Sequence, residues 1–138
     1  MNDWSLSFSE RLEYPDNLQG INLKIIISSD RNFPVAANVK LDTGSSLCVF
    51  QPFYAEMLGL EVESGEPETI RTATGSFKAF GHEITFTVGN LEWDATVFFA
   101  ADENFPVSVV GQTGFLNRLK IGLIDYEQLL FLGFVVSE

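Results

Sequence analysis

The chain has 138 residues with a formal net charge of −11, and 46% of its residues are hydrophobic. A chain of this length can bury about two-thirds of its unfolded surface, which favours a single domain over residues 1–138. Because phosphate backbones and anionic lipids repel an acidic surface, the charge argues against both as partners. We therefore expect neither a nucleic-acid nor a membrane partner.

Cysteine usage and the chain ends indicate a compartment. Cys48 is the only cysteine, so no disulfide can form within the chain, and a reducing compartment fits. The first residues, MNDWSLSFSERLEY, lack the basic stretch and apolar run of a secretory signal. The longest apolar run, LLFLGFVV at 129–136, is far shorter than the roughly 20 residues that a membrane helix needs. These features predict a cytoplasmic protein.

Alternating and β-branched runs predict short strands along most of the chain. In chain order, the predicted strands are 21–28, 35–41, 47–50, 83–88, 91–98, 107–110 and 119–124. Gly89-Asn90 is a two-residue hairpin signal between two of them. Two segments look helical, 53–58 after a proline and 113–118 with Thr113 as a possible cap. Many short strands with few helical turns indicate an all-β barrel or sandwich.

Acidic residues gather in the middle of the chain. The polar stretch GEPE, residues 65–68, is interpreted as a break between the two halves rather than a domain boundary. Glu61, Glu63, Glu66 and Glu68 are most simply a solvated loop.

The stretch VKLDTGSSLCVF, residues 39–50, carries a carboxylate, Asp42, from an alternating strand into a turn of Thr43, Gly44 and Ser45. Asp-Thr-Gly alone is a weak signal, because average residue usage produces it by chance in roughly a few per cent of chains this long. A plain β-turn favours the same residue types for backbone reasons. The tripeptide by itself therefore leaves a structural turn and a catalytic acid both open.

A second signature, Val109-Val110-Gly111, lies further along the chain and is followed by a short predicted helix. Together, the two motifs resemble those of the retropepsin-like aspartic proteases, the single-domain relatives of retroviral proteases and of each pepsin lobe. The resemblance covers residues from about Ile21 to Leu132, and GFL at 114–116 looks closer to cellular, bacterial-type members. It implies an all-β fold, a closed acid-protease-type barrel with one or two short helices and a flap hairpin, assembled as a homodimer.

The resemblance also implies a mechanism. Pepsin-like enzymes carry two such turns in one chain, whereas this chain has one, so a two-fold axis would bring together Asp42 of two copies. Two adjacent carboxyls cannot both ionise easily, and aspartic proteases are the standard case of a pair that shares one proton. The ionised member would activate a water, and the protonated member would hydrogen-bond the scissile carbonyl. This chemistry requires no metal and no cofactor.

Neighbouring residues take supporting roles in the same picture. Gly44 would let the two loops approach and would offer its N–H to the carboxylates. Thr43 would bond the partner loop, and Ser45 would bond an outer oxygen of Asp42. These roles are implied by the resemblance and follow its catalytic loop.

The second motif would thread beneath the catalytic loop, with Val110 of Val109-Val110-Gly111 packing there. Many retroviral enzymes place an ion pair between these two regions. The corresponding positions here hold Ser46 and Gln112, which are both neutral, so a hydrogen bond between them could substitute.

The stretch TIRTATGSFKAFG, residues 69–81, reads as a hairpin with Gly75 near its tip, in the interval where family members place the flap. Thr74, Gly75 and Ser76 are expected at the flap tip, bonding the substrate backbone. The alternative is an ordinary surface hairpin.

The apolar run 129–136 would be an exposed edge strand at the chain end, and such a strand tends to pair with another chain. In the family, terminal strands of two subunits interleave. The alternative is a strand covered by its own domain, for example by WSLSF at residues 4–8.

Other chemistry finds less support. A Cys48 nucleophile would need a base, and the only histidine, His82, is expected at a strand start facing solvent. Clustered zinc ligands are absent from the sequence, as is a P-loop.

The sequence thus predicts a homodimeric aspartic endopeptidase that binds an extended peptide, with apolar side chains favoured beside the cut. A non-catalytic module for dimerisation or peptide binding is the alternative, since fold does not settle function. A third interpretation pairs this chain with a different subunit that bears its own Asp-Thr-Gly turn.

Overall fold

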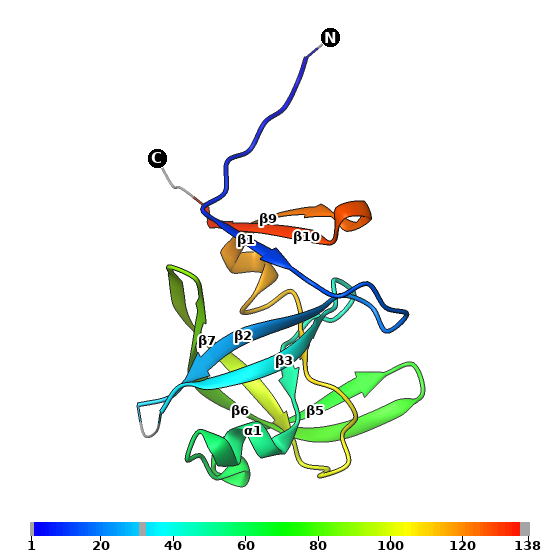
Figure 1. Ribbon diagram of the computed structural model, residues 1–138. Helices are drawn as coiled ribbons and strands as arrows, with labels where there is room; N and C mark the ends of the chain where they lie inside the picture. Colours follow the sequence, from blue (N-terminus) through cyan, green and yellow to red (C-terminus); the bar gives the residue numbers. More distant parts are fainter. Residues whose placement is uncertain (1, 31–32, 136–138) are drawn as a thin grey trace.

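The computed structural model describes residues 2–30 and 33–135, and within them the chain is mostly β-structure. In these ranges it forms two sheets, one α-helix and three short 3₁₀ helices, arranged as in Figure 1. Residues 1, 31, 32 and 136–138 lie outside the described part, so the predicted domain 1–138 and the run 129–136 are described only in part. No helix in the described ranges is long and apolar enough to cross a membrane.

The larger sheet has seven strands and curls into a partly closed ring. In spatial order, these are β2 (Asn22–Ser28), β3 (Val35–Leu41), β8 (Val109–Val110), β4 (Val49–Phe50), β7 (Leu91–Ala100), β6 (Gly75–Val88) and β5 (Glu66–Thr72). Further pairing between β2 and β6 brings its two sides together. The all-β prediction is confirmed, but the barrel is less closed than expected, because β4 and β8 are two residues long and meet through a single pair, Val49↔Val109.

Side-chain alternation explains why these strands form where they do. In β2, Leu23, Ile25 and Ile27 are buried, and the residues between them are exposed. The hairpin between β6 and β7 turns at Gly89, which has a φ of 58° that glycine adopts at little cost. The predicted strand 83–88 is the end of the longer β6, and the predicted strands 47–50 and 107–110 shorten to β4 and β8.

Only one of the two predicted helices is an α-helix. The segment 53–58 appears as α1 (Pro52–Met57), with proline in the first turn where its missing N–H costs nothing. The segment 113–118 forms a turn and then the 3₁₀ helix η2 (Leu116–Arg118). Gly114 explains the difference, because its φ of 98° cannot continue an α-helix.

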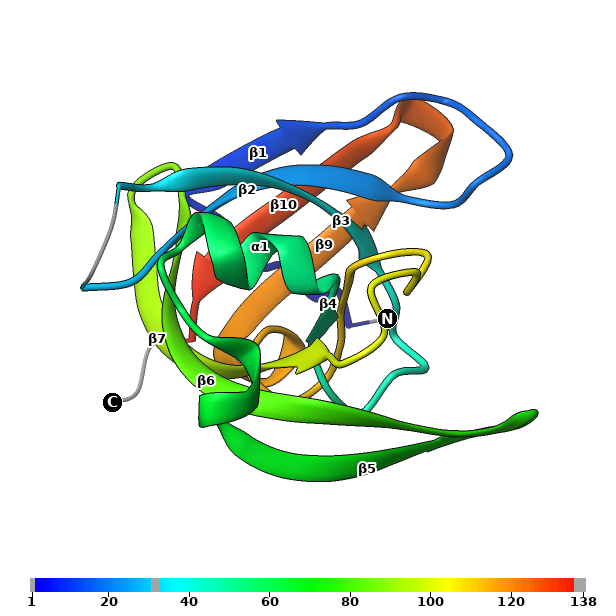
Figure 2. The same ribbon diagram turned by 90° about the horizontal axis from the view of Figure 1, so that it is seen from below.

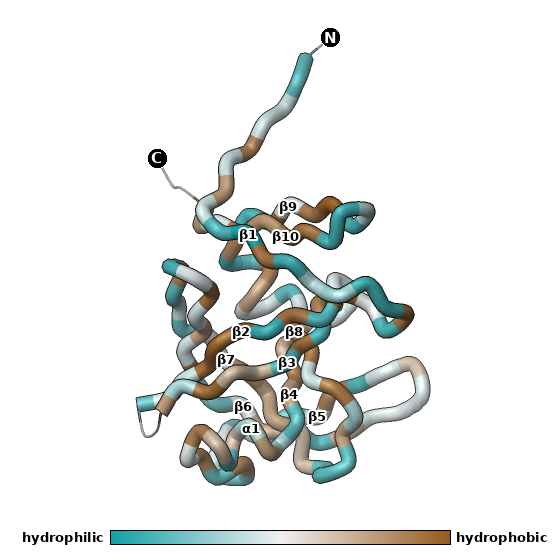
Figure 3. The backbone as a smooth tube through the Cα atoms, in the orientation of Figure 1, coloured by the Kyte–Doolittle hydropathy of each residue, from teal (hydrophilic) through white to brown (hydrophobic). Residues whose placement is uncertain are grey.

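The core lies inside the ring and is rich in aromatic side chains. Phe50, Phe86, Phe99 and Phe115 are completely buried, and Phe86 stacks on Trp93 with ring centroids 5.4 Å apart. Figure 3 shows hydrophobic segments along β2, β3 and β10, whereas the turn joining β5 and β6 is pale. The four phenylalanines come from β4, β6, β7 and the segment after β8, so the core ties the two motifs of the sequence to one structure.

The smaller sheet holds the first and last strands, lies at the top of Figure 1, and shares the core of the ring, in which Leu130 and Leu132 are completely buried. Its order is β1 (Glu10–Glu13), β10 (Leu129–Phe134) and β9 (Leu119–Ile124). The prediction that the apolar run is an exposed edge is wrong, because β10 lies in the middle, paired with β9 along its whole length and with β1 over residues 129–132. The remaining 3₁₀ helices are η1 (Val62–Ser64), between α1 and β5, and η3 (Asp125–Glu127), in the turn from β9 to β10.

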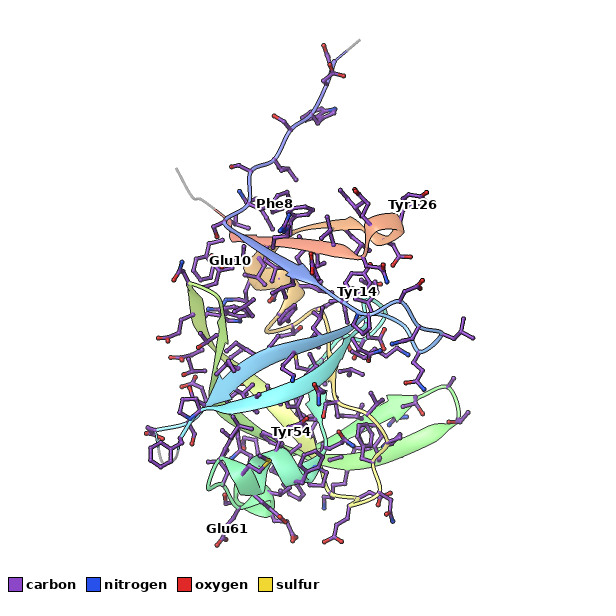
Figure 4. All side chains as sticks on the ribbon, viewed as in Figure 1. Phe8, Glu10, Tyr14, Tyr54, Glu61 and Tyr126 are labelled. Atoms are coloured by element: carbon purple, nitrogen blue, oxygen red, sulfur yellow. The ribbon has the colours of Figure 1, made fainter. Side chains whose placement is uncertain are left out.

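Two aromatic residues, Phe8 and Tyr14, attach the N-terminal part of the chain to this sheet. The Phe8 ring lies against Phe131 with centroids 5.8 Å apart, and it rests on Gly122, where an added Cβ would lie 2.8 Å from the ring. Tyr14 donates a hydrogen bond of 2.5 Å to Asp125 in η3, and Figure 4 shows it between the sheet and the ring. Burial and the Asp125 carboxylate raise the pKa of Tyr14 to about 12. The alternative of a strand covered by its own domain therefore holds: β1 pairs with β10, and Phe8, the last residue of the segment 4–8, packs on it.

Candidate active site

Asp42 follows directly on β3 and is held by the backbone around it. Its N–H donates to the Val110 carbonyl at 3.0 Å, and its own carbonyl accepts from the Ser45 N–H at 3.1 Å. The Gly44 N–H donates to Asp42 Oδ1 at 3.0 Å. The half-buried carboxylate is therefore fixed by a tight turn and not by a charged neighbour.

The other predicted residues of this loop differ in what they contact. Thr43 and Gly44 are exposed, so their surfaces are open to a partner or a ligand. The Ser45 hydroxyl donates to the Leu47 carbonyl at 2.7 Å. The expected hydrogen bond from Ser45 to an outer oxygen of Asp42 is therefore absent, because the hydroxyl instead stabilises the bend that follows the loop.

The second motif lies directly under this loop. Val109 and Val110 form β8, which runs parallel to β3 and places Val110, completely buried, opposite Leu41. A Cβ added at Gly111 would lie 2.4 Å from the Ser45 carbonyl oxygen and 2.5 Å from that of Leu47. Only glycine fits at this crossing, so the two motifs of the sequence pack against each other without a side chain between them.

Main-chain hydrogen bonds join the Asp42 loop to the residues that follow the second motif. The Gln112 N–H donates to Ser45 O at 2.8 Å, and the Thr113 N–H donates to Ser46 O at 3.0 Å. The Gln112 side chain makes a long hydrogen bond of 3.5 Å to the Thr43 carbonyl. The predicted hydrogen bond between the side chains of Ser46 and Gln112 is therefore wrong, since the amide reaches the loop backbone instead.

Cys48 is buried at the same crossing and is not poised as a nucleophile. Its Sγ accepts from the Gly111 N–H at 3.4 Å and donates to the Thr113 carbonyl at 3.5 Å. Burial raises the pKa of the Cys48 thiol to about 11, although the Gly111 hydrogen bond lowers it in part. The buried thiol therefore joins the two segments within the core.

His82 lies elsewhere, in the interior of β6. Its Nε2 is 2.9 Å from the Val62 carbonyl oxygen, and its ring packs on Phe99 with centroids 5.7 Å apart. The prediction of a solvent-facing histidine at a strand start is wrong, because β6 begins seven residues earlier, at Gly75, and the ring is half-buried. Its hydrogen bond joins β6 to η1.

The predicted flap is a long two-stranded hairpin of β5 and β6, which Figure 2 shows extending beyond the body of the molecule. The strands pair from Glu66↔Gly81 to Thr72↔Gly75, which leaves Ala73 and Thr74 as the two turn residues. The hairpin therefore starts earlier than predicted, and GEPE is not a break but mostly the start of β5. An edge strand accommodates the proline at position 67 because its missing N–H need not pair.

The three residues predicted at the flap tip fall at and just after the turn. Thr74 lies in the turn, Gly75 follows it with a φ of 153°, and Ser76 pairs with Arg71. The Thr72 hydroxyl donates to the Gly75 carbonyl at 3.1 Å and closes the turn. All of these residues are exposed.

A groove of about 480 Å³ runs between the catalytic loop and the flap. Its lining comprises Asp42, Gly44, Ser45, Ser46, Leu47, Val49, Ile70, Arg71, Thr72, Ala73, Phe77, Phe105 and Val109. Phe77 in β6 meets Phe105, in the segment after β7, with ring centroids 5.0 Å apart. The structure thus brings Asp42, two of its loop neighbours and one residue of the second motif together with the hairpin in one site.

Sequence reasoning missed several residues of this lining. Ile70 and Phe77 form a cross-strand pair on one face of the hairpin, and both are partly buried. Each lies three residues from the nearer residue of the Ala73–Thr74 turn, so a correct hairpin register would have predicted from sequence that they pair. Phe105 lies in an irregular segment, and only the fold brings it to the groove.

In residues 2–30 and 33–135, no three histidine, cysteine, aspartate or glutamate side chains are grouped so that they could hold a metal ion. Asp42 supplies a carboxylate to the lining of the groove, and the Gly44 N–H orients its Oδ1. A carboxylate held in this way is suited to general acid–base chemistry on a water.

Comparison with known proteins agrees with this geometry. A family model described as aspartyl protease matches residues 34–116, which is more than half of the chain and includes both motifs. The chain belongs to the aspartyl protease family. In this family member, the matched region runs from just before β3 to the start of η2.

Solved structures show the same fold. A retropepsin-like aspartic protease from Rickettsia conorii aligns with a TM-score of 0.64 and 21% identity, over 88% of this chain and 98% of that one. EIAV protease, complexed with the inhibitor HBY-793, aligns with a TM-score of 0.52 and 20% identity, over 71% of this chain and 88% of that one. The comparison with curated proteins found no match. The fold is therefore retropepsin-like.

Proposed function

We propose that this chain is an aspartic endopeptidase whose working form is a homodimer, with Asp42 of each copy in one catalytic pair. The observation that carries the proposal is the placement of Asp42, which the Gly44 N–H and the Val110 carbonyl fix in a groove beneath a hairpin flap. One chain supplies a single such acid, and rotation about a two-fold axis supplies the second.

In the proposed mechanism, the two Asp42 carboxyls share one proton and hold a water between them. The ionised carboxylate removes a proton as the water attacks the scissile carbonyl. The protonated carboxyl donates to the carbonyl oxygen and later helps to protonate the leaving amine. Thr43, Gly44 and Ser45 support this loop, and Val109, Val110 and Gly111 hold it from below.

The substrate would be an extended peptide lying between the acids and the flap. The turn residue Thr74 and its neighbours Gly75 and Ser76 would bond the peptide backbone, with Ala73 beside them at the groove. Leu47, Val49, Ile70, Phe77 and Phe105 make most of the wall apolar, which favours apolar side chains beside the cut.

The dimer contact is proposed to combine the exposed catalytic loop with the terminal sheet. Because β10 is paired on both sides, that sheet would contribute its edges and surface and not a free β10 strand. Trp4 is 94% exposed and Leu6 is 67% exposed, and Leu123 and Ile124 are also exposed. Burying such apolar surface would favour association. A cytoplasmic location stays a prediction from the single cysteine.

Replacing the acid tests the function. Asp42→Asn should lower cleavage of a peptide library by about a thousandfold, because the base that activates water is lost. Circular dichroism and sedimentation of the variant should match the wild type, which separates lost chemistry from lost folding. Undiminished cleavage by Asp42→Asn would exclude the catalytic pair. A wild type that dimerises and cleaves nothing between pH 4 and 7 would instead indicate a peptide-binding module.

A further inference from the structure

Among the described residues that line the groove, Arg71 is the one basic residue. Asp42 carries the other charge there, and the remaining lining residues are apolar or neutral. The whole chain has a net charge of −11, so its long-range field repels an acidic peptide. The positive charge of Arg71 can therefore attract an acidic side chain locally, although the net charge of the protein repels acidic peptides.

This guanidinium has no partner in the part of the chain that the structure describes. Arg71 is exposed, and its side chain makes neither a hydrogen bond nor an ion pair nor a ring contact there. Two other basic side chains are engaged: Arg118 donates to the Asp94 carbonyl at 2.7 Å, and Lys120 lies 5.7 Å from the Phe8 ring. Arg71 is thus free to bind an incoming group.

The hairpin ladder places Arg71 at the rim of the groove, close to the flap tip. It pairs with Ser76, one step before the pair that closes the turn. Successive side chains of a strand point to opposite faces, so Arg71 lies opposite the face that carries Ile70 and Phe77. Ile70 and Phe77 line the apolar wall, whereas the exposed Arg71 belongs to the lining next to the flap turn.

We propose that Arg71 is a specificity-determining residue that makes the groove favour peptides with an aspartate or glutamate flanking the cut. This inference rests on the proposed function and names its substrate class. A guanidinium offers two parallel N–H donors that match a carboxylate, and such charge-assisted pairs are stronger than neutral ones. In a homodimer, Arg71 of each protomer would act on its own side of the cut.

The test compares peptides that differ at a single position. A neutral peptide that the wild type cleaves is first mapped, and each position beside the cut is then changed in turn to Glu, Gln or Lys. At one position or more, kcat/KM for Glu should exceed that for Gln about fivefold, the upper range for an exposed charge pair. Added salt should reduce this ratio, because exposed charges are screened.

Variants of the flap identify the residue responsible. Arg71→Gln should bring the ratio of Glu to Gln peptides close to one, and Arg71→Glu should reverse it in favour of Lys. Lys78→Gln is the matched control, because it also removes one positive charge. Lys78 lies on the same face of the hairpin as Arg71 but is not among the residues that line the groove. That control should keep the wild-type ratio.

A wild type without a Glu preference at any position would overturn the inference, as would an Arg71→Gln variant that keeps the preference. In either case, cleavage of the neutral peptide would leave the proposed function standing. Failure of the wild type to cleave any peptide would remove the proposed function, and this inference with it.

Discussion

The catalytic loop and the flap line the same groove, but the fold holds them in opposite ways. The loop is bonded to the segment after β8 through Ser45 and Ser46, and Gly111 leaves no free space beneath it. The flap pairs with β7 only from Ala79 onward, and beyond that point its strands pair mainly with each other. The core therefore places Asp42, whereas we expect that the hairpin over it can move without disturbing that core.

This contrast has a physical reason. A catalytic acid must keep its geometry within a fraction of an ångström, and buried backbone bonds supply such rigidity. A peptide must enter and leave, so its cover belongs to the less stable part of a structure, with exposed ladder bonds and few buried contacts. The following changes test whether rigidity and mobility are divided in this way, in order of expected effect.

The largest effect is expected at Gly111. Gly111→Ala would place its Cβ 2.4 Å from the Ser45 carbonyl oxygen, so the catalytic loop must move. Overpacking of this kind costs about 3 kcal/mol at its upper range, and cleavage should be lost with it. Urea unfolding and peptide cleavage measure both effects.

Gly75→Ala is the matched control in the flap, where an added Cβ meets nothing within 4 Å and only the φ of 153° is strained. It should cost about 1 kcal/mol. An equal decrease in the free energy of unfolding for the two variants would show that the loop and the flap are equally rigid.

A smaller effect is expected from the thiol beneath the loop. The pKa of Cys48 is raised from 9.0 to about 11 in the folded protein, so the unfolded chain loses its proton first as the pH rises. The free energy of unfolding should therefore be intact below pH 9 and fall by about 2 kcal/mol as the pH rises to 11. Denaturant titrations across this range measure it.

Cys48→Ala provides the reference, since it has no thiol and should lack this component of the pH dependence. Iodoacetamide should also label the wild type only when it unfolds. Rapid labelling of the native protein at neutral pH would contradict a rigid, closed crossing.

The smallest effect is expected at the link between the flap and the body. Phe105→Ala removes the ring that meets Phe77 at 5.0 Å, and such aromatic pairs contribute about 1 kcal/mol. KM should rise and limited proteolysis of the flap should accelerate, whereas global stability should change little. Phe53→Ala, in the exposed face of α1, is the control and should leave KM unchanged. A large loss of global stability without a change in flap proteolysis would place Phe105 in the core instead.

Local patterns predicted the parts of the molecule that depend on local rules. The alternation of β2 and β3 reports which faces are buried, and the Asp42 turn follows β3 in the sequence as it does in space. The hairpin at Gly89-Asn90 is a short-range signal of the same kind. These elements could be predicted from sequence because the residues of each one contain the pattern that specifies it.

Strands that form only because another strand pairs with them could not be predicted from their own residues. β1 has the sequence ERLE, with one apolar residue, and it forms a strand because β10 lies beside it. β5 begins in GEPE and forms because β6 pairs with it. The position of β10 inside its sheet follows from β1, so missing β1 made β10 look like an edge.

The candidate site likewise contains some residues that local motifs predict and others that only the fold brings together. Asp42 and the motif at Gly111 were predicted from sequence, whereas the Ser45 hydrogen bond to Leu47 depends on the fold. Phe105 and Arg71 join the site only through the path of the chain in space.

The most direct test of the central claim mixes active and inactive chains. Wild type and Asp42→Asn are co-expressed in varied proportions, and activity is measured against the fraction of wild-type chains. If both acids of a pair are required, activity follows the square of that fraction, so equal amounts leave about a quarter of the full rate. A linear decline, with about half of the rate remaining, would show that each chain cleaves with its own Asp42 and would contradict the shared pair.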